Sequence, residues 1–237
     1  MLSLVGLGLG TTKDVTLRGV DVIRSADEVY LETYTSSMQA TVEDLEHTLG
    51  KKITPVDRDF VEFNLGKLVD TARDAHIVLL VIGSPMAATT HFEFILEAEK
   101  QGVAWQVVEN ASVLTAVGIT GLSLYKFGRV TTIPFENKEI RTPYEAYLAN
   151  KKAGLHTLFL LDITPEKMMT VREGLDYLLR LGLPKKTIVV GCAALGSEEQ
   201  RVRVGTAEAL TLEGFPQCFI LHGELNFKEE EALKMWQ

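Results

Sequence analysis

Residues 77–91 read IVLLVIGSPMAATTH and hold the pattern on which the predicted fold depends. The first six form a short apolar run rich in β-branched residues, which is typical of a strand buried on both faces of a parallel sheet. Gly83 and Pro85 end this strand, and Thr90 and Glu93 have the spacing of a capping box, so we expect a helix to begin at Thr90. Open α/β sheets bind ligands in loops that follow the carboxyl ends of strands. This loop is therefore the first candidate site.

Strand and helix patterns alternate on both sides of this stretch. Strands are predicted at 2–6, 28–33, near 53, 77–82, 103–108, 129–133, 156–162, 187–193, 201–204 and 217–221. Helices are predicted at 16–26, 41–49, 60–75, from 90, 112–122, from 142, from 170, near 206 and from 226. The order predicts two α/β domains, with a mainly parallel N-terminal sheet and a mixed C-terminal sheet whose antiparallel edge is 201–204. We place the N-terminal domain at 1–110 and the C-terminal domain at 111–237, although no linker-like composition marks the boundary.

The composition excludes several classes of protein. Of the 237 residues, 46% are hydrophobic and 24% charged, and no apolar run approaches the length that spans a bilayer. The first residues lack the basic leader of a signal peptide, so we expect a cytoplasmic location. A net charge of −8 argues against nucleic acid as a direct partner. Cys192 and Cys218 lie in apolar contexts and are predicted to be buried thiols, and no metal site is expected because no Cys-x-x-Cys occurs.

Three glycines follow the first predicted strand. Gly6, Gly8 and Gly10 resemble a dinucleotide-binding fingerprint, but the third glycine comes one residue early and Thr11 occupies its place. The pattern is therefore compatible with a dinucleotide-binding oxidoreductase and equally with a simple turn. In both cases the main chain passes close to another group at this point.

Other candidate residues carry polar chemistry. Residues 32–36, Glu-Thr-Tyr-Thr-Ser, end the second strand with a carboxylate, a phenol and hydroxyls that are suited to lining a site. His91 is a possible catalytic base, but a hydrogen-bonded structural histidine is the favoured interpretation. His156 begins an apolar strand, and a satisfied structural histidine is favoured there as well.

A set of motifs occurs in the order found in one known family. They are Gly6-Leu7-Gly8-Leu9, residues 32–36, Gly83-Ser84-Pro85, Ala88-Thr89-Thr90-His91, Ser112-Val113, residues 116–122, 125–128, 154–157 and 161–163. The chain resembles the archaeal diphthine synthases, within the tetrapyrrole-methylase-like class of S-adenosylmethionine-dependent methyltransferases. The resemblance covers nearly the full length, and the blocks at 88–91 and 117–122 are specific to this branch.

The resemblance implies a fold, a reaction and a set of cofactor residues. Each chain would have two α/β domains with S-adenosylmethionine in the cleft between them, and two chains would form a homodimer. The substrate would be a histidine of translation elongation factor 2 that carries a 3-amino-3-carboxypropyl group, whose amino nitrogen is methylated in diphthamide biosynthesis. The cofactor-binding positions carried over are Leu9, Ser84, Ala87, Ser112, Val113, Leu161, Leu195 and Gln217. No catalytic residue is assigned, since a desolvated cleft can itself lower the pKa of an ammonium group.

Two departures from the family pattern bear on the site. The family usually has Gly-Asp-Pro where this chain has Gly83-Ser84-Pro85, so a neutral hydroxyl replaces a carboxylate and main-chain groups would have to compensate. The C-terminal third, which contains Leu195 and Gln217, is shortened relative to the family.

Open questions remain about the methyl acceptor and the class of function. Tyr34 and Tyr125 are candidates for contacting a methylated, cationic product through their aromatic faces. A methyltransferase acting on a tetrapyrrole, a dinucleotide-binding oxidoreductase and a non-catalytic binding module are the alternatives.

Overall fold

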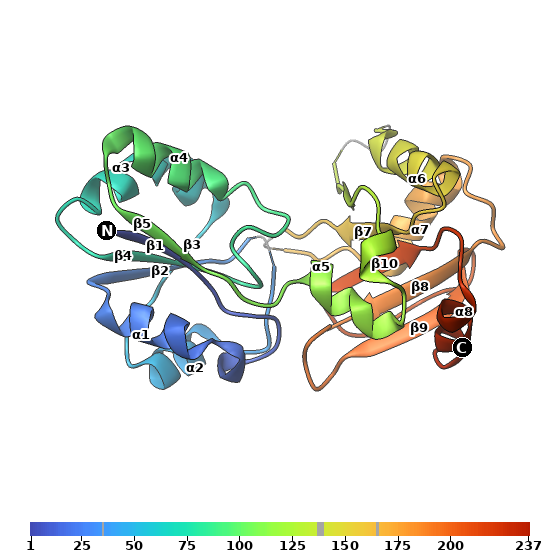
Figure 1. The fold of residues 1–237 in the computed structure, drawn as a ribbon, viewed down its shortest axis with the longest axis horizontal. Helices are drawn as coiled ribbons and strands as arrows, with labels where there is room; N and C mark the ends of the chain where they lie inside the picture. The colour runs from blue at the N-terminus through green and yellow to red at the C-terminus, as the bar shows by residue number, and fades with distance from the viewer. Residues whose placement is uncertain (35, 137–139, 165) are drawn as a thin grey trace. The chain divides into compact units, whose positions relative to one another are not determined.

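The computed structural model describes residues 1–34, 36–136, 140–164 and 166–237. It divides the chain into two compact units, Met1–Leu114 and Thr115–Gln237, each built on one five-stranded sheet (Figure 1). The first sheet is parallel and the second is mixed, so the predicted α/β fold class is confirmed.

The sheet of the first unit has the strand order β3-β2-β4-β1-β5. Its strands are β1 (Leu2–Gly6), β2 (Glu28–Glu32), β3 (Thr54–Val56), β4 (Ile77–Val81) and β5 (Trp105–Val108). Every neighbouring pair is parallel. All residues of β1 and β4 are buried, as the apolar run in the sequence indicates for central strands.

Helices cover both faces of this first sheet (Figure 1). They are α1 (Leu17–Ser25), α2 (Val42–Leu49), α3 (Arg58–Thr71) and α4 (Phe92–Gln101), with a 3₁₀ turn η1 (Thr12–Asp14) before α1. The side chains of β4 alternate between two cores. Ile77 and Leu79 pack in the core with α3 and α4 residues, whereas Val78 and Leu80 pack in the core with α1 and α2 residues.

This arrangement creates a switch point between β1 and β4. The two strands are neighbours, but β1 leads into α1 on one face of the sheet and β4 leads into α4 on the other. The connecting segments therefore lead to opposite faces of the sheet, and a point of this kind is where ligands bind in open parallel sheets.

The second unit has the strand order β6-β7-β10-β8-β9. Its strands are β6 (Thr131–Ile133), β7 (Thr157–Leu161), β8 (Ile188–Ala193), β9 (Arg201–Thr206) and β10 (Gln217–Leu221), and its longer helices are α6 (Thr142–Lys152), α7 (Val171–Arg180) and α8 (Phe227–Lys234). Within the described part of this second sheet, β6 and β7 pair in parallel and the other neighbouring strands are antiparallel; the antiparallel edge predicted at 201–204 is confirmed as β9. Residues of α6 and α7 share a core with this sheet, centred on the stacked rings of Phe159 and Phe219 at 4.7 Å.

A buried carboxylate ties α8 to the rest of the second unit. Glu229 Oε1 accepts hydrogen bonds from the Ser123 N–H at 3.0 Å and from His156 Nε2 at 3.1 Å. Its Oε2 accepts from Lys126 Nζ at 2.6 Å and from the Asn226 N–H at 2.9 Å. Both Glu229 and His156 are almost fully buried, so the structural interpretation of His156 is confirmed. We call these five residues the Glu229 cluster.

The predicted elements differ from the structure mainly at their starts. The helix expected from Thr90 begins at Phe92, because Thr90 contributes its carbonyl to a turn and His91 occupies the N-cap without a side-chain cap bond. The helix expected from Thr142 includes Thr142, and its N-cap is Arg141. In neither helix is the threonine with capping-box spacing the N-cap residue.

Two predicted helices are wrong in length or type. The one expected at 112–122 is a single turn, α5 (Val113–Ala116), followed by a 3₁₀ turn η2 (Val117–Thr120), and Gly121 ends it with a φ of 85°. A further 3₁₀ turn, η3 (Leu124–Lys126), follows. No helix forms near Thr206 in the described chain, since β9 extends to that residue and a turn follows.

Candidate functional site

The main chains after β1 and β4 cross at the switch point through two glycines. The Gly8 N–H donates to the Gly83 carbonyl at 3.1 Å and the Gly83 N–H donates to the Gly8 carbonyl at 2.8 Å. Gly8 and Gly83 have φ values of 79° and 86°, which residues with a side chain adopt only under strain. A Cβ on Gly6 would lie 2.6 Å from the Gly83 carbonyl oxygen. The glycine pattern is therefore explained by chain crossing.

The turn after β1 is already bound by a carboxylate of the chain itself. The N–H groups of Gly10 and Thr11 both donate to Asp14 Oδ2 at 2.8 Å. Asn110 Nδ2 donates to the carbonyls of Gly6 and Asp14 at 2.9 and 3.0 Å. A dinucleotide fold uses N–H groups of this turn for a pyrophosphate. Because Asp14 occupies them here, the turn is unsuited to a dinucleotide and the oxidoreductase alternative loses its support.

The loop after β4 brings a hydroxyl and a carboxylate together. Ser84 is 7% exposed, and its hydroxyl donates to Glu109 Oε2. Glu109 is exposed and follows β5 directly. Since β1 lies between β4 and β5, this hydrogen bond passes over the end of β1. A carboxylate is thus present beside position 84 although residue 84 is serine; no pattern in the sequence pointed to Glu109.

The five cofactor positions expected in the first unit gather at this edge of the sheet. Leu9 is half-buried beside Gly83, and Ala87 is half-buried, with its N–H donating to the Ser84 carbonyl at 3.1 Å. Ser112 is buried and Val113 half-buried just beyond the end of β5. The structure brings these residues together with Ser84, and their contact with a cofactor stays a prediction.

A buried contact between a histidine and a carboxylate lies at the same edge, after β4 and at the end of β2. His91 Nε2 lies 2.9 Å from Glu32 Oε2, and the two side chains are 2% and 0% exposed. Within the described residues, His91 Nδ1 is buried and makes no hydrogen bond. This burial favours the structural interpretation of His91. The Arg58 guanidinium lies over the Tyr34 ring, with its central carbon 5.4 Å from the ring centre. Thr35 lies outside the described residues.

The three cofactor positions expected in the second unit also share one edge of their sheet. Leu161 ends β7, Leu195 follows the end of β8, and Gln217 begins β10, where it pairs with Ala193. The Gln217 amide is already engaged: its oxygen accepts from the Val171 N–H at 2.7 Å, and its nitrogen donates to two carbonyls in the preceding turn. Any cofactor contact of Gln217 is therefore expected through its main chain.

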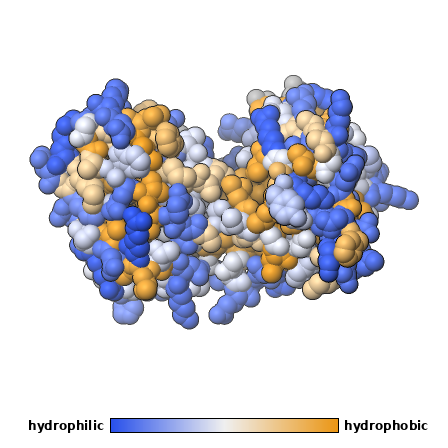
Figure 2. All heavy atoms as spheres, in the orientation of Figure 1, coloured by the Kyte–Doolittle hydropathy of each residue, from blue (hydrophilic) through white to orange (hydrophobic). Residues whose placement is uncertain are grey.

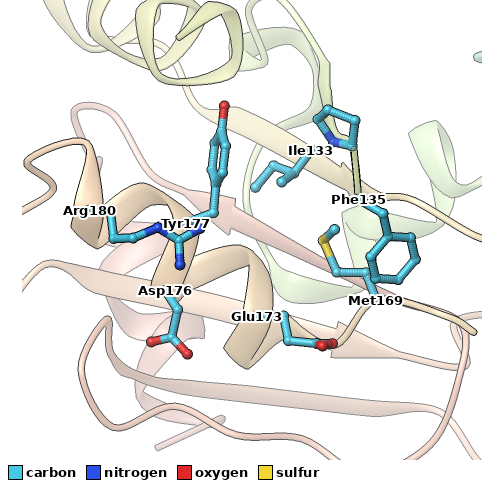
Figure 3. A pocket seen from close by; sticks show the side chains of 8 residues that line it. Ile133, Phe135, Met169, Glu173, Asp176, Tyr177 and Arg180 are labelled. Carbon is cyan, nitrogen blue, oxygen red and sulfur yellow. The ribbon is translucent and has the colours of Figure 1, made fainter. Parts of the chain in front are cut away.

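A small cavity opens at this second edge, between the end of β6 and α7 (Figure 3). Ile133, Phe135 and Met169 supply apolar walls, and Glu173, Asp176, Tyr177 and Arg180 project from α7. Its volume of about 190 Å³ is below the roughly 300 Å³ at which pockets for drug-sized ligands begin. It is too small to hold a whole nucleoside cofactor.

The outer surface is that of a folded α/β protein. In the face shown in Figure 2, hydrophilic residues predominate around the rim of each unit and hydrophobic residues form patches between them. Tyr125, the second aromatic candidate, is 88% exposed on η3. Among the described helices, none combines the length and apolar character needed to cross a membrane.

A parallel sheet whose carboxyl edge is bridged by the main chains of Gly8 and Gly83, followed by a unit with a mixed sheet, defines a two-unit α/β protein. The family model for Tetrapyrrole (Corrin/Porphyrin) Methylases matches residues 1–211, and the chain belongs to this family. It is accordingly a methyltransferase, and its methyl donor is of the S-adenosylmethionine type. The class expected from the motifs is confirmed.

Individual relatives cover the whole chain. Diphthine synthase of Methanococcus aeolicus is 41% identical, with 99% of this chain and 97% of the relative covered. A probable diphthine methyl ester synthase of Arabidopsis thaliana is 36% identical, covering 100% and 98%. A crystal structure of diphthine synthase superposes with a TM-score of 0.93 at 35% identity, covering 99% of this chain and 95% of that one. A putative diphthine synthase from Entamoeba histolytica gives a TM-score of 0.90 at 30% identity, covering 100% and 98%.

Proposed function

We propose that this protein is a diphthine synthase. It transfers methyl groups from S-adenosylmethionine to the amino nitrogen of a 3-amino-3-carboxypropyl-histidine on translation elongation factor 2. The observation that carries the proposal is the similarity over 99% of the chain to proteins named diphthine synthase, in sequence and in structure. A tetrapyrrole as acceptor is the alternative, and it has only the family name in its favour.

The residues at the two sheet edges fit such a donor. We propose that Leu9, Ser84, Ala87, Ser112 and Val113 hold it at the switch point, where crossing glycines let a ligand approach the main chain closely. Leu161, Leu195 and Gln217 are the proposed cofactor-binding residues of the second unit. When bound, the sulfonium supplies an electrophilic methyl group.

The chain's own task is to place the acceptor amine in line with the donor and to keep it neutral. Correct placement alone contributes up to roughly 7–11 kcal/mol in favourable cases. Exclusion of water lowers the pKa of the acceptor ammonium and frees its lone pair. We assign no general base, since His91 Nδ1 is buried within the core of the first unit.

The direct test is methylation of the proposed protein substrate. Elongation factor 2 carrying the 3-amino-3-carboxypropyl-histidine is incubated with the purified protein and S-adenosylmethionine, and the modified peptide is weighed by mass spectrometry. Mass increments of whole methyl groups on that histidine support the proposal. An unchanged peptide, together with methylation of an added tetrapyrrole, would establish the alternative.

The same experiment determines where the methyl groups go. One relative is named for formation of a methyl ester, so the product is also treated with mild base, which cleaves esters and leaves N-methyl groups intact. We expect all increments to survive. Loss of one increment would assign ester formation to this chain as well.

Two further properties belong to the proposal. We propose a homodimer in the cytoplasm, where the elongation factor acts, without direct binding of nucleic acid. Multi-angle light scattering of the purified protein checks the first point, since a monomeric mass at working concentration would exclude a stable dimer.

A further inference from the structure

We infer that Glu109 is a donor-binding residue, whose carboxylate is held in position by Ser84 and binds a hydrogen-bond donor group of S-adenosylmethionine. The inference rests on the proposed use of this cofactor. It adds a residue that lies outside every cofactor motif recognised in the sequence. The groups it can bind are the α-ammonium and the ribose hydroxyls, which share the same donor chemistry.

The position of Glu109 is determined by the sheet. It follows β5, the strand beyond β1, and its Oε2 accepts the Ser84 hydroxyl from the loop after β4. The next residue, Asn110, is held by bonds from its side chain to the carbonyls of Gly6 and Asp14. Hydrogen bonds therefore hold both the residue after Glu109 and the Glu109 carboxylate against the segments around the ends of β1 and β4.

The direction of the Ser84 hydrogen bond assigns the roles. A serine hydroxyl has one proton, and that of Ser84 is donated to Glu109. Ser84 is therefore left without a proton for a ligand. Glu109 keeps its second oxygen, Oε1, which makes no hydrogen bond to the described residues, and its side chain is exposed. Of the two groups, only the carboxylate has strong unused acceptor capacity at the crevice.

The chemistry of the carboxylate selects the ligand group. An ionised carboxylate accepts from ammonium and hydroxyl donors, and such charge-assisted hydrogen bonds are about twice as strong as neutral ones. The main chain is closely packed beside it, since a Cβ on Gly6 would meet the Gly83 carbonyl, the Asn110 Cβ and the Pro85 ring.

The experiment measures binding and does not depend on catalysis. Isothermal titration calorimetry gives the dissociation constants of S-adenosylhomocysteine and methylthioadenosine, the second of which lacks the amino-acid portion. The variants are Glu109→Gln, the double variant Ser84→Asp/Glu109→Gln, and the control Glu43→Gln, an exposed glutamate on α2. Thermal unfolding confirms that each variant is folded.

We expect Glu109→Gln to bind S-adenosylhomocysteine about 10-fold more weakly than the wild-type protein, as removal of one charge-assisted hydrogen bond predicts. The double variant places a carboxylate at residue 84, opposite residue 109, and its dissociation constant for S-adenosylhomocysteine should lie within about threefold of the wild-type value. A purely structural role of Glu109 would give no such rescue. Weaker methylthioadenosine binding assigns the contact to the ribose, whereas unchanged methylthioadenosine binding assigns it to the ammonium.

The outcomes that overturn the inference are distinct from those that overturn the proposed function. Binding by Glu109→Gln that matches the wild-type protein and the Glu43→Gln control refutes the role of Glu109 and leaves the function standing. A loss of binding that the double variant does not recover also refutes it. Failure of the wild-type protein to bind S-adenosylhomocysteine at all overturns the proposed function and the inference with it.

Discussion

Replacing Glu229 by glutamine should destabilise the second unit strongly. The carboxylate accepts four hydrogen bonds, from Ser123, Lys126, His156 and Asn226, and it is 1% exposed. Glutamine preserves the shape but loses the charge, and its amide nitrogen faces groups that are themselves donors. Breaking a buried ion pair costs about 3–5 kcal/mol, and we expect about 3 kcal/mol because one acceptor oxygen remains. That corresponds to a fall in unfolding temperature of roughly 6–12 °C for a chain of this size.

The assay is differential scanning calorimetry with a neighbouring control. Glu230 lies on the same helix but is exposed, so Glu230→Gln changes the same net charge without touching the Glu229 cluster. The control should stay within about 1 °C of the wild-type protein, as surface substitutions do. A Glu229→Gln transition that coincides with the control would refute the view that the cluster holds α8 in place.

The effect should also depend on pH. Burial raises the pKa of Glu229, but hydrogen bonds from Lys126, Asn226, Ser123 and His156 outweigh it and leave the pKa well below its ordinary value. A depressed carboxyl pKa contributes stability above the unfolded pKa of about 4.3, and this is lost as the pH falls through the folded value. The stabilisation that the Glu229 carboxylate provides should therefore be fully present at about pH 5, and the difference between the wild-type protein and Glu229→Gln should shrink below about 4. A difference that grows as the pH falls from about 4 to about 2 would contradict the assignment.

Three other predictions address the first unit. Gly8→Ala places a Cβ 2.7 Å from that of Asp14 at a φ of 79° and should lower the free energy of unfolding by about 1–3 kcal/mol in urea titrations; full stability would contradict the crowding at the crossing. His91→Phe removes a buried polar partner of Glu32 and should lower the free energy of unfolding by about 1–3 kcal/mol; a double-mutant cycle with Glu32→Leu that shows no coupling would count against the contact. Tyr34→Leu removes an aromatic face worth about 0.5–1 kcal/mol to a methylated cation and should slow the later methyl additions, as seen in the distribution of methyl numbers by mass spectrometry; an identical distribution excludes Tyr34.

Much of the fold could be predicted because its signals are local. The apolar run at 77–82 contains no polar residue, so neither face of the strand is suited to contact with water. This run forms β4, which is fully buried. Capping boxes at Thr41 and Thr170 begin helices at the expected places. At Thr90 and Thr142 the same spacing was misleading, because the N-cap residues there are His91 and Arg141, which have αR backbone and make no side-chain cap bond.

The site was predictable only where single segments define it. The loop from Gly83 to His91 and the residues after β1 could be identified from glycine positions and from motif order. The contact between Ser84 and Glu109 joins residues 25 positions apart across an intervening strand, so it depends on strand order, which no local pattern encodes. The same holds for the pair of Glu32 and His91, and for the amide of Gln217 that caps α7.

The main-chain crossing of Gly8 and Gly83 has a consequence for how this enzyme can be dissected. The bonded groups here are peptide N–H and carbonyl groups, so an alanine substitution leaves them in place and measures only the strain and crowding that the added Cβ causes. Methods that alter the backbone itself, such as replacing a peptide bond by an ester, are the ones suited to measuring what this crossing contributes.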